Sequence, residues 1–273
     1  MQASNSWQPP EGPLGRLTAA SHQRAAALEA ERKLWEANAK DVNWVHPFVQ
    51  AFDGAEVAVI AELKRSSPSK GPLNLDMSLG QRAKAYELGG AAAISVLTEP
   101  SAFGGSDGHL HQVKESVLIP LLKKDFHVSE VQILQARALH ASAVLLIARA
   151  LPPDLLRHLI EFAFRHSVEP VVEIRSEREL DLAVEFGAHV IGVNARNLET
   201  LEIEPAVQSI LLPQVPSSCL AIAESGVESR EQVERLAALG ADAILVGSAL
   251  SVAGDARAAV AALAGVPRCL RVA

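Results

Sequence analysis

The sequence is poor in cysteine, has no long apolar run and carries no excess of basic charge. Its 273 residues include only two cysteines, Cys219 and Cys269, which form neither a disulfide framework nor a zinc-binding pattern. The longest apolar runs, such as 143–148, fall far short of the roughly 20 residues that span a bilayer. The net charge of −7, from 25 basic and 32 acidic residues, argues against a general binder of nucleic acid or anionic membranes. We therefore expect a soluble protein with no nucleic-acid or membrane partner.

The first ten residues also lack the features of a secretory signal. They contain no basic segment and no apolar segment. Together with the low cysteine content, this pattern is typical of a protein of a reducing compartment, so we expect a cytoplasmic location.

What the chain does contain is an internal repeat. The end of a helical pattern runs into small residues and then into a β-rich stretch at Ala91, Ala141, Ala188 and Ala241, which are 50, 47 and 53 residues apart. One further strand-like run lies between each pair, so every period of about 50 residues holds two strand-helix units. With the apolar run 57–61 at the front, the pattern predicts eight strands.

Eight strands rich in Val, Ile and Ala, each followed by an amphipathic helix, are typical of a parallel sheet closed into a barrel. We therefore predict an α/β protein, a single (β/α)8 TIM barrel with an N-terminal helical extension. The predicted domains are an N-terminal arm and extension over 1–54, the barrel over 55–265 and a C-terminal tail over 266–273.

Two parts of the extension can be distinguished in the sequence. Residues 1–15 contain three prolines and are expected to form a loose arm, whereas 16–40 are charged and helix-forming. We expect this helix to cover the amino-terminal face of the barrel, and a contribution to the active site is the alternative.

Charged and polar residues follow almost every predicted strand. In a TIM barrel, catalytic groups lie at the carboxyl ends of the strands and in the loops that follow. A single charge there is often merely solvated, but lysines and glutamates on several strand ends are not explained in that way. The candidates are Glu62, Lys64, Arg65, Ser67, Lys124, Asp125, Glu173, Asn194, Arg196, Glu224, Ser225, Gly226, Gly247 and Ser248.

Two glycine-containing strand ends favour a phosphate site. Residues 223–227 read Ala-Glu-Ser-Gly-Val, and 245–250 read Leu-Val-Gly-Ser-Ala-Leu. Glycine lets a backbone N–H approach a phosphate closely, and a short helix that begins at Ser248 directs its positive end at the anion. The loops after strands seven and eight bind phosphate in many barrels of this kind, so the pattern indicates a phosphosugar substrate but not the reaction.

A basic loop follows the first strand. Residues 60–71, Ile-Ala-Glu-Leu-Lys-Arg-Ser-Ser-Pro-Ser-Lys-Gly, favour an anionic substrate because they place three cations close together on an acidic protein. This segment closely resembles the indole-3-glycerol phosphate synthase family, whose signature runs Ile-Ala-Glu-x-Lys-x-x-Ser-Pro-Ser. The resemblance continues, in the family's order, through 95–100 with Phe103, 123–126, 172–174, 191–198 and 223–226.

The resemblance implies a carboxy-lyase of tryptophan biosynthesis. Its substrate would be 1-(2-carboxyphenylamino)-1-deoxyribulose 5-phosphate, whose indole ring is closed with loss of carbon dioxide and water. The resemblance assigns proton donation to Lys124, and it assigns to Glu173 the role of base and stabiliser of a cationic intermediate. Lys64 would bind the substrate carboxylate, with an acid role in dehydration left open, and Glu62 and Asn194 would position lysines and hydroxyls.

The same resemblance implies the binding residues. Phe103, Phe126 and Leu198 would enclose the anthranilate ring, and ordinary packing at the barrel mouth is the alternative. The implied substrate-binding residues are Ser67, Phe103, Phe126, Arg196, Leu198 and Ser225, and the phosphate-binding residues are Gly226, Gly247 and Ser248.

Lys124 and Glu173 are expected to form an acid and base pair. They end strands three and five, which are alternate strands and can direct side chains into the same mouth. We expect the nearby cations Lys64 and Arg65 to lower the pKa of Lys124 towards the working range.

Two alternative functions explain less of the sequence. A different phosphosugar barrel, such as phosphoribosylanthranilate isomerase, does not account for Lys64, Lys124 and Glu173 together, and a non-catalytic barrel predicts loss of a charged strand end. His109 and His111 have no third ligand in pattern, so we expect no metal and no cofactor. We expect a monomer that acts on a small phosphosugar, with association with other tryptophan-pathway enzymes left open.

Overall fold

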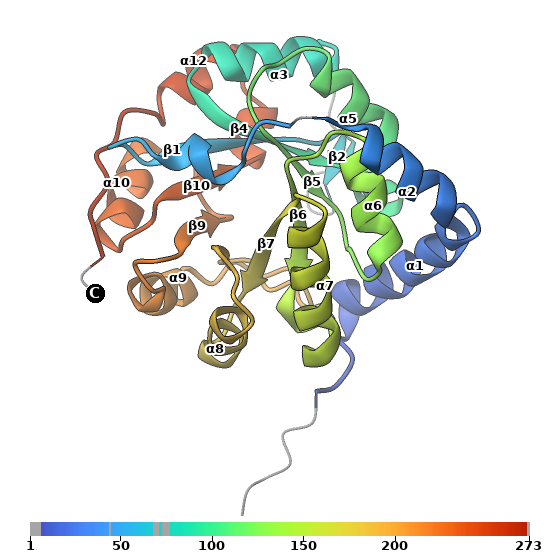
Figure 1. The fold of residues 1–273 in the computed structure, drawn as a ribbon. Coiled ribbons are helices and arrows are strands. Elements are labelled where there is room, and N and C mark those ends of the chain that lie inside the picture. The colour runs from blue at the N-terminus through green and yellow to red at the C-terminus, as the bar shows by residue number, and fades with distance from the viewer. Residues whose placement is uncertain (1–6, 44, 68–70, 73–76, 272–273) are drawn as a thin grey trace, which may run out of the picture.

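The computed structural model describes residues 7–43, 45–67, 71–72 and 77–271, and the side chain of Ser67 lies outside this description. Within these ranges, eight parallel strands close into a barrel (Figure 1), which confirms the predicted fold class. Around the barrel the strands are β1 (Ala58–Leu63), β10 (Ala243–Val246), β9 (Leu220–Glu224), β8 (Val190–Asn194), β7 (Glu169–Ile174), β6 (Ala143–Ile147), β5 (Leu121–Lys124) and β4 (Ala91–Leu97). A short antiparallel pair, β2 (Ser66–Ser67) and β3 (Gly71–Pro72), lies in the loop after β1.

Helices cover the outside of the barrel, and several of them have a serine as the N-cap residue. Ser78 and Ser229 each form a capping box with a glutamine three residues later, and Ser176 Oγ accepts a hydrogen bond from Glu179 N. The helices after β1 are α3 (Leu79–Leu88), α4 (Pro100–Phe103), α5 (Asp107–Lys114), α6 (Glu130–Ala138), η2 (Ala148–Ala150), α7 (Pro153–Arg165), α8 (Glu177–Glu185), α9 (Pro205–Leu211), η3 (Leu212–Gln214), α10 (Arg230–Ala238), α11 (Ser248–Ser251) and α12 (Ala256–Ala261).

Each strand contributes side chains to two hydrophobic cores, because successive side chains point to opposite faces of the sheet. Outward residues such as Val59 pack in the layer between the strands and the helices. Inward residues such as Ile60, Leu122, Val171 and Ile222 fill the barrel interior. The residue two positions beyond each of these four also faces inward, at the carboxyl end. These residues are Glu62, Lys124, Glu173 and Glu224.

The N-terminal extension forms α1 (Gly12–Glu29) and α2 (Arg32–Asp41), which lie beside α6 (Figure 1). The helix begins earlier than expected, so 12–15 are not part of a loose arm. α1 contacts the carboxyl-terminal mouth, where Leu14 N donates to Leu198 O at 3.0 Å and Ser21 Oγ donates to Phe126 O. The expectation that this helix covers the amino-terminal face is therefore wrong, because periodicity indicates a buried face but not the surface that buries it.

A different segment closes the amino-terminal face. Phe48 and Phe52, at the 3₁₀ turn η1 (Val49–Phe52), are each 2% exposed and join the core of the barrel interior. Their rings meet edge to face with centroids 5.0 Å apart. The barrel is thus plugged at one end by η1 and roofed at the other by α1.

Candidate active site

The carboxyl ends of the strands surround a pocket of about 710 Å³. The site residues that the sequence predicts line this pocket, with two exceptions: Arg65 is not among the lining residues, and the side chain of Ser67 lies outside the described part of the chain. They come from loops and strand ends spread over nearly 190 residues of sequence, and the closed barrel brings them together. The predicted catalytic and binding residues among the lining are Glu62, Lys64, Phe103, Lys124, Phe126, Glu173, Asn194, Arg196, Leu198, Ser225, Gly226, Gly247 and Ser248.

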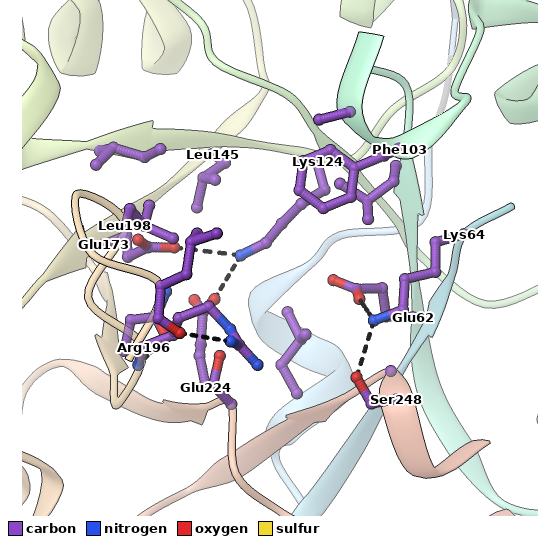
Figure 2. Close-up of a pocket in the computed structure, with 18 of the residues that line it drawn as sticks. Glu62, Lys64, Phe103, Lys124, Leu145, Glu173, Arg196, Leu198, Glu224 and Ser248 are labelled. Atoms are coloured by element: carbon purple, nitrogen blue, oxygen red, sulfur yellow. Dashed lines mark hydrogen bonds and ion pairs between the residues drawn. The ribbon is translucent and has the colours of Figure 1, made fainter. Parts of the chain in front are cut away.

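Lys124 lies at the centre of the pocket between two carboxylates (Figure 2). Its Nζ donates to Glu173 Oε2 at 3.3 Å and to Glu224 Oε2. β5, β7 and β9 are alternate strands of the barrel, so the three residues belong to one layer of inward side chains. All three are buried, which strengthens their electrostatic interaction.

The surroundings of Lys124 keep it charged. Burial lowers its pKa, but the negative charges of Glu224, Glu173 and Glu62 outweigh burial and raise the pKa above the ordinary value. The expectation that Lys64 and Arg65 lower this pKa is therefore wrong, because the charges that dominate at Nζ are carboxylates. Burial, reinforced by the charge of Glu173, raises the pKa of Glu224 to about 7.

Glu224 lies at the centre of the site beside Lys124, and sequence reasoning assigned it no role, although its strand-end position made it a candidate. The signal that could have identified it is its spacing of two from the inward residue Ile222. Neighbouring β8 leaves room for its side chain, because a Cβ at Gly192 would collide with Glu224 Oε1. A glycine in mid-strand often marks such a close approach.

A second charged group lies across the pocket (Figure 2). Lys64 Nζ donates to Glu62 Oε1 at 3.1 Å and to Ser248 Oγ at 3.2 Å. A Cβ at Gly247 would overlap Glu62 Oε1 and lie 2.9 Å from Lys64 Nζ, so this glycine makes room for the pair. Lys64 is therefore held next to the predicted phosphate residues.

The loop after β9 has an unusual backbone at the same end of the pocket. Ser225 has φ of 68° and Gly226 has φ of 76°, so two successive residues adopt the left-handed conformation. For serine this conformation is strained, and such strain is often found where a backbone is shaped for a ligand. As predicted, the short helix α11 begins at Ser248 beside this turn.

The loop after β8 carries Arg196 and Leu198 into the pocket. Asn194 Oδ1 accepts from Arg196 N at 2.9 Å, and Arg196 Nη1 donates to Leu201 O at 2.9 Å. Leu201 has φ of 68°, which turns its carbonyl within reach of the guanidinium. Asn194 was expected to position a lysine or a hydroxyl group. Its Oδ1 instead accepts a hydrogen bond from the backbone of this loop.

An apolar wall completes the pocket. Phe103 comes from α4, Phe126 follows β5, and Leu198 lies in the β8 loop. Leu14 and Leu17 of α1 also line the pocket, so the N-terminal helix contributes to the site. Sequence periodicity could not single out these two leucines, because it does not tell which buried helix face meets a cavity.

The described part of the chain contains neither a metal-binding cluster nor a membrane-spanning helix. No group of three or more His, Cys, Asp or Glu side chains among these residues is arranged to hold a metal ion. No helix within the described ranges is long and apolar enough to cross a membrane.

A barrel mouth with two lysines, three buried glutamates and a glycine-lined turn places the chain among the barrel enzymes that act on anionic, phosphorylated substrates. Within this class, the chain belongs to the indole-3-glycerol phosphate synthase family, whose family model matches residues 15–263.

Individual relatives agree with this assignment. Indole-3-glycerol phosphate synthase 2 of Streptomyces coelicolor is 43% identical, over 89% of this chain and 93% of the relative. The indole-3-glycerol phosphate synthase of a Nocardioides species is also 43% identical, over 92% of this chain and 95% of the relative. Among solved structures, 3-hexulose-6-phosphate synthase from Salmonella typhimurium has a TM-score of 0.61 at 16% identity, over 76% of this chain and 96% of that one, and shares the fold.

Proposed function

We propose that this protein converts 1-(2-carboxyphenylamino)-1-deoxyribulose 5-phosphate into indole-3-glycerol phosphate, carbon dioxide and water, a carboxy-lyase step of tryptophan biosynthesis. The observation that carries the proposal is the buried Lys124 between Glu173 and Glu224 in a chain whose family match spans the whole barrel. A phosphoribosylanthranilate isomerase would have no evident use for this lysine and its two carboxylates.

The proposed binding mode follows from where the charges and the apolar wall lie. The phosphate occupies the end formed by Gly226, Gly247 and Ser248, and the anthranilate ring lies along Phe103, Phe126 and Leu198. Lys64 binds the substrate carboxylate and, through its contact with Ser248, also reaches towards the phosphate end. Arg196 contributes a further cation at the rim, and Ser67 and Ser225 assist binding.

The first chemical step forms the ring. The aromatic carbon that carries the carboxylate attacks the ketone carbon, the amine nitrogen becomes positive, and the ketone oxygen takes a proton from Lys124 Nζ. Because this proton donor sits in a buried site, its interaction with the developing oxyanion is strong. Glu173 and Glu224 stabilise the positive nitrogen and keep the ammonium of Lys124 in place.

Two eliminations complete the reaction. The bond to the carboxylate breaks, carbon dioxide leaves, and its electron pair restores the aromatic ring and neutralises the nitrogen. One of the two lysines then protonates the new hydroxyl group, which leaves as water, while Glu173 removes a proton from the adjacent ring carbon. Glu62 orients Lys64 for its part through the 3.1 Å contact.

We also propose that the protein works in the cytoplasm as a monomer. The proposed catalytic and binding residues and the α1 helix over them all come from a single chain, and this supports the proposal. Association with another enzyme of the pathway would therefore add to a site that one chain already forms. Light scattering at assay concentration should give a mass near 29.0 kDa.

The test is direct turnover of the proposed substrate. Purified protein and the carboxyphenylamino-deoxyribulose phosphate should give indole fluorescence, with one carbon dioxide released per indole formed. The same preparation should leave phosphoribosylanthranilate unchanged. A folded protein that forms no indole product would contradict the proposal, and turnover of phosphoribosylanthranilate would favour the isomerase instead.

A further inference from the structure

We infer that Arg24, on the N-terminal helix α1, is a positioning residue that fixes two walls of the pocket at once. It lies outside the pocket and touches no proposed substrate atom. Its effect on catalysis is inferred for the reaction proposed above and rests on that function, whereas its structural effect does not.

One guanidinium joins two buried carboxylates. Arg24 Nη2 lies 2.6 Å from Asp125 Oδ1, and Arg24 Nη1 lies 3.5 Å from Glu99 Oε1. Glu99 is 0% exposed and Asp125 is 5% exposed, so both charges need a partner inside the protein. The planar guanidinium can bridge two carboxylates, which the single ammonium of a lysine does less well.

Glu99 positions the first of these walls, which contains Phe103. Its carboxylate accepts hydrogen bonds from Ser101 N at 2.9 Å and from Ala102 N at 2.7 Å, and so caps the amino end of α4. α4 is a single turn that ends at Phe103, a residue of the proposed ring-binding wall. The orientation of Glu99 therefore sets the position of Phe103.

Asp125 positions the second wall, which contains Phe126. It follows Lys124 directly, and its Oδ1 accepts from Phe126 N at 2.8 Å while its Oδ2 accepts from Thr98 Oγ1 at 2.8 Å. Thr98 N in turn donates to Lys124 O at 3.1 Å. The carboxylate of Asp125 thus anchors the backbone that follows the proposed proton donor, through Phe126 N, and links it to Thr98, which itself binds Lys124 O.

Removal of Arg24 should disturb these walls without unfolding the barrel. Lys123 Nζ lies 4.0 Å from Asp125 Oδ2, so Asp125 keeps a cation nearby when Arg24 is replaced. Glu99 loses the guanidinium, and its carboxylate is then free to shift away from the amino end of α4. Displacements of about 1 Å at a reacting group can reduce rates by about 100-fold.

The chain offers a matched control. Arg32, on α2, has a similarly half-buried side chain and also ties the N-terminal extension to the barrel, through Arg32 Nη1 and Glu130 Oε2 at 2.9 Å. Glu130 lies on α6 and does not line the pocket. Loss of Arg32 should therefore report the purely structural cost of loosening the extension.

The experiment compares Arg24→Met with Arg32→Met. We expect Arg24→Met to lower kcat by about 10- to 100-fold and to raise KM, because a wall of the pocket and the proton donor both shift. Arg32→Met should keep both constants within about 2-fold at a comparable loss of Tm. Arg24→Lys should recover only part of kcat. Kinetic constants of Arg24→Met that match those of wild type or of Arg32→Met would overturn the inference.

Hydrogen exchange tests the same link without substrate. In Arg24→Met the amides of Ser101, Ala102 and Phe126 should exchange faster than in wild type, and in Arg32→Met they should not change. If wild-type protein forms no indole product, the proposed reaction fails, and the exchange result alone decides the structural link. Unchanged exchange at these amides in Arg24→Met would overturn the inference in either case.

Discussion

Lys124 and Glu224 determine how the site responds to pH. The carboxylates around Lys124 raise its pKa, whereas burial raises the pKa of Glu224 to about 7. The lysine therefore remains a charged proton donor over the working range, and Glu224 changes its charge within that range. An ionised Glu224 both holds Lys124 and stabilises a positive substrate nitrogen, so the ionised form should be the active one.

We predict that kcat/KM rises with pH through about 7 and shows no decrease from Lys124 below about pH 10. In Glu224→Gln the rise near 7 should disappear. The second ionisation of the substrate phosphate, near about 6, should remain in both proteins and serves as the control. Steady-state kinetics of wild type and Glu224→Gln across this pH range measure both ionisations. A rise near 7 that persists in Glu224→Gln would show that another group titrates there.

For individual residues, the sequence predicted which side chains lie together in the pocket but not how they interact. Alternation of strands correctly placed Lys124 and Glu173 in one mouth. Charges near the loop motif suggested a lowered lysine pKa, yet the groups that act on Nζ are 49 and 100 residues away in sequence. Spatial distances between strand ends are set by barrel closure, and a linear pattern does not contain them.

At the scale of elements, the two ends of the barrel have different tasks. α1 roofs the carboxyl-terminal pocket, and η1 plugs the amino-terminal end with Phe48 and Phe52. In barrels of this kind the carboxyl-terminal face carries the chemistry and the opposite face carries stability. The plug can therefore be altered with little effect on the site.

Phe52→Ala should lower the free energy of unfolding by about 3–5 kcal/mol, because it leaves a cavity in a well-packed core. Its kcat and KM should stay within about 2-fold of wild type at a temperature where it is folded. The milder Phe52→Leu should lose less stability and also keep its activity. Denaturant unfolding and steady-state kinetics on the same samples provide the measurements. A large loss of kcat in a sample that is fully folded would mean that the plug acts on the site.

The sequence predicted the elements better than their placement. The eight strands followed from the repeat and from apolar runs, because every barrel strand is buried on both faces. The position of α1 did not follow, since the contacts of Leu14 and Ser21 with Leu198 and Phe126 join segments over 100 residues apart. Amphipathic periodicity contains no information about such partners.

At the scale of the whole molecule, stability depends on a largely buried acid outside the active-site pocket. Glu169, at the start of β7, has a side chain that is 14% exposed and lies 3.3 Å from His189 Nδ1. Burial raises the pKa of Glu169 from 4.5 to about 7. The folded protein thus binds this proton more tightly than the unfolded chain, so the free energy of unfolding falls as pH rises between these two values.

Glu169→Gln should remove this dependence. At pH 8 the ionised, buried carboxylate costs wild type about 3 kcal/mol, so the variant should be more stable there by up to that amount. At pH 4 both proteins carry a neutral group and should unfold alike. Glu224 contributes a similar slope to both proteins, so the difference between them isolates Glu169. A variant that is equally stabilised at pH 4 and pH 8 would contradict this explanation.

The central claim is that Lys124, held by Glu173 and Glu224, donates the proton that drives ring closure. Its most direct test is the single-turnover rate of indole formation for wild type, Lys124→Met and Lys124→Arg, each checked for a native circular dichroism spectrum. We predict a loss of at least about 100-fold in Lys124→Met, the scale of general acid catalysis, and no rescue in Lys124→Arg, because a guanidinium hardly releases its proton. A folded Lys124→Met that keeps more than about a tenth of the wild-type rate would contradict the claim, since that loss is under about 1.4 kcal/mol.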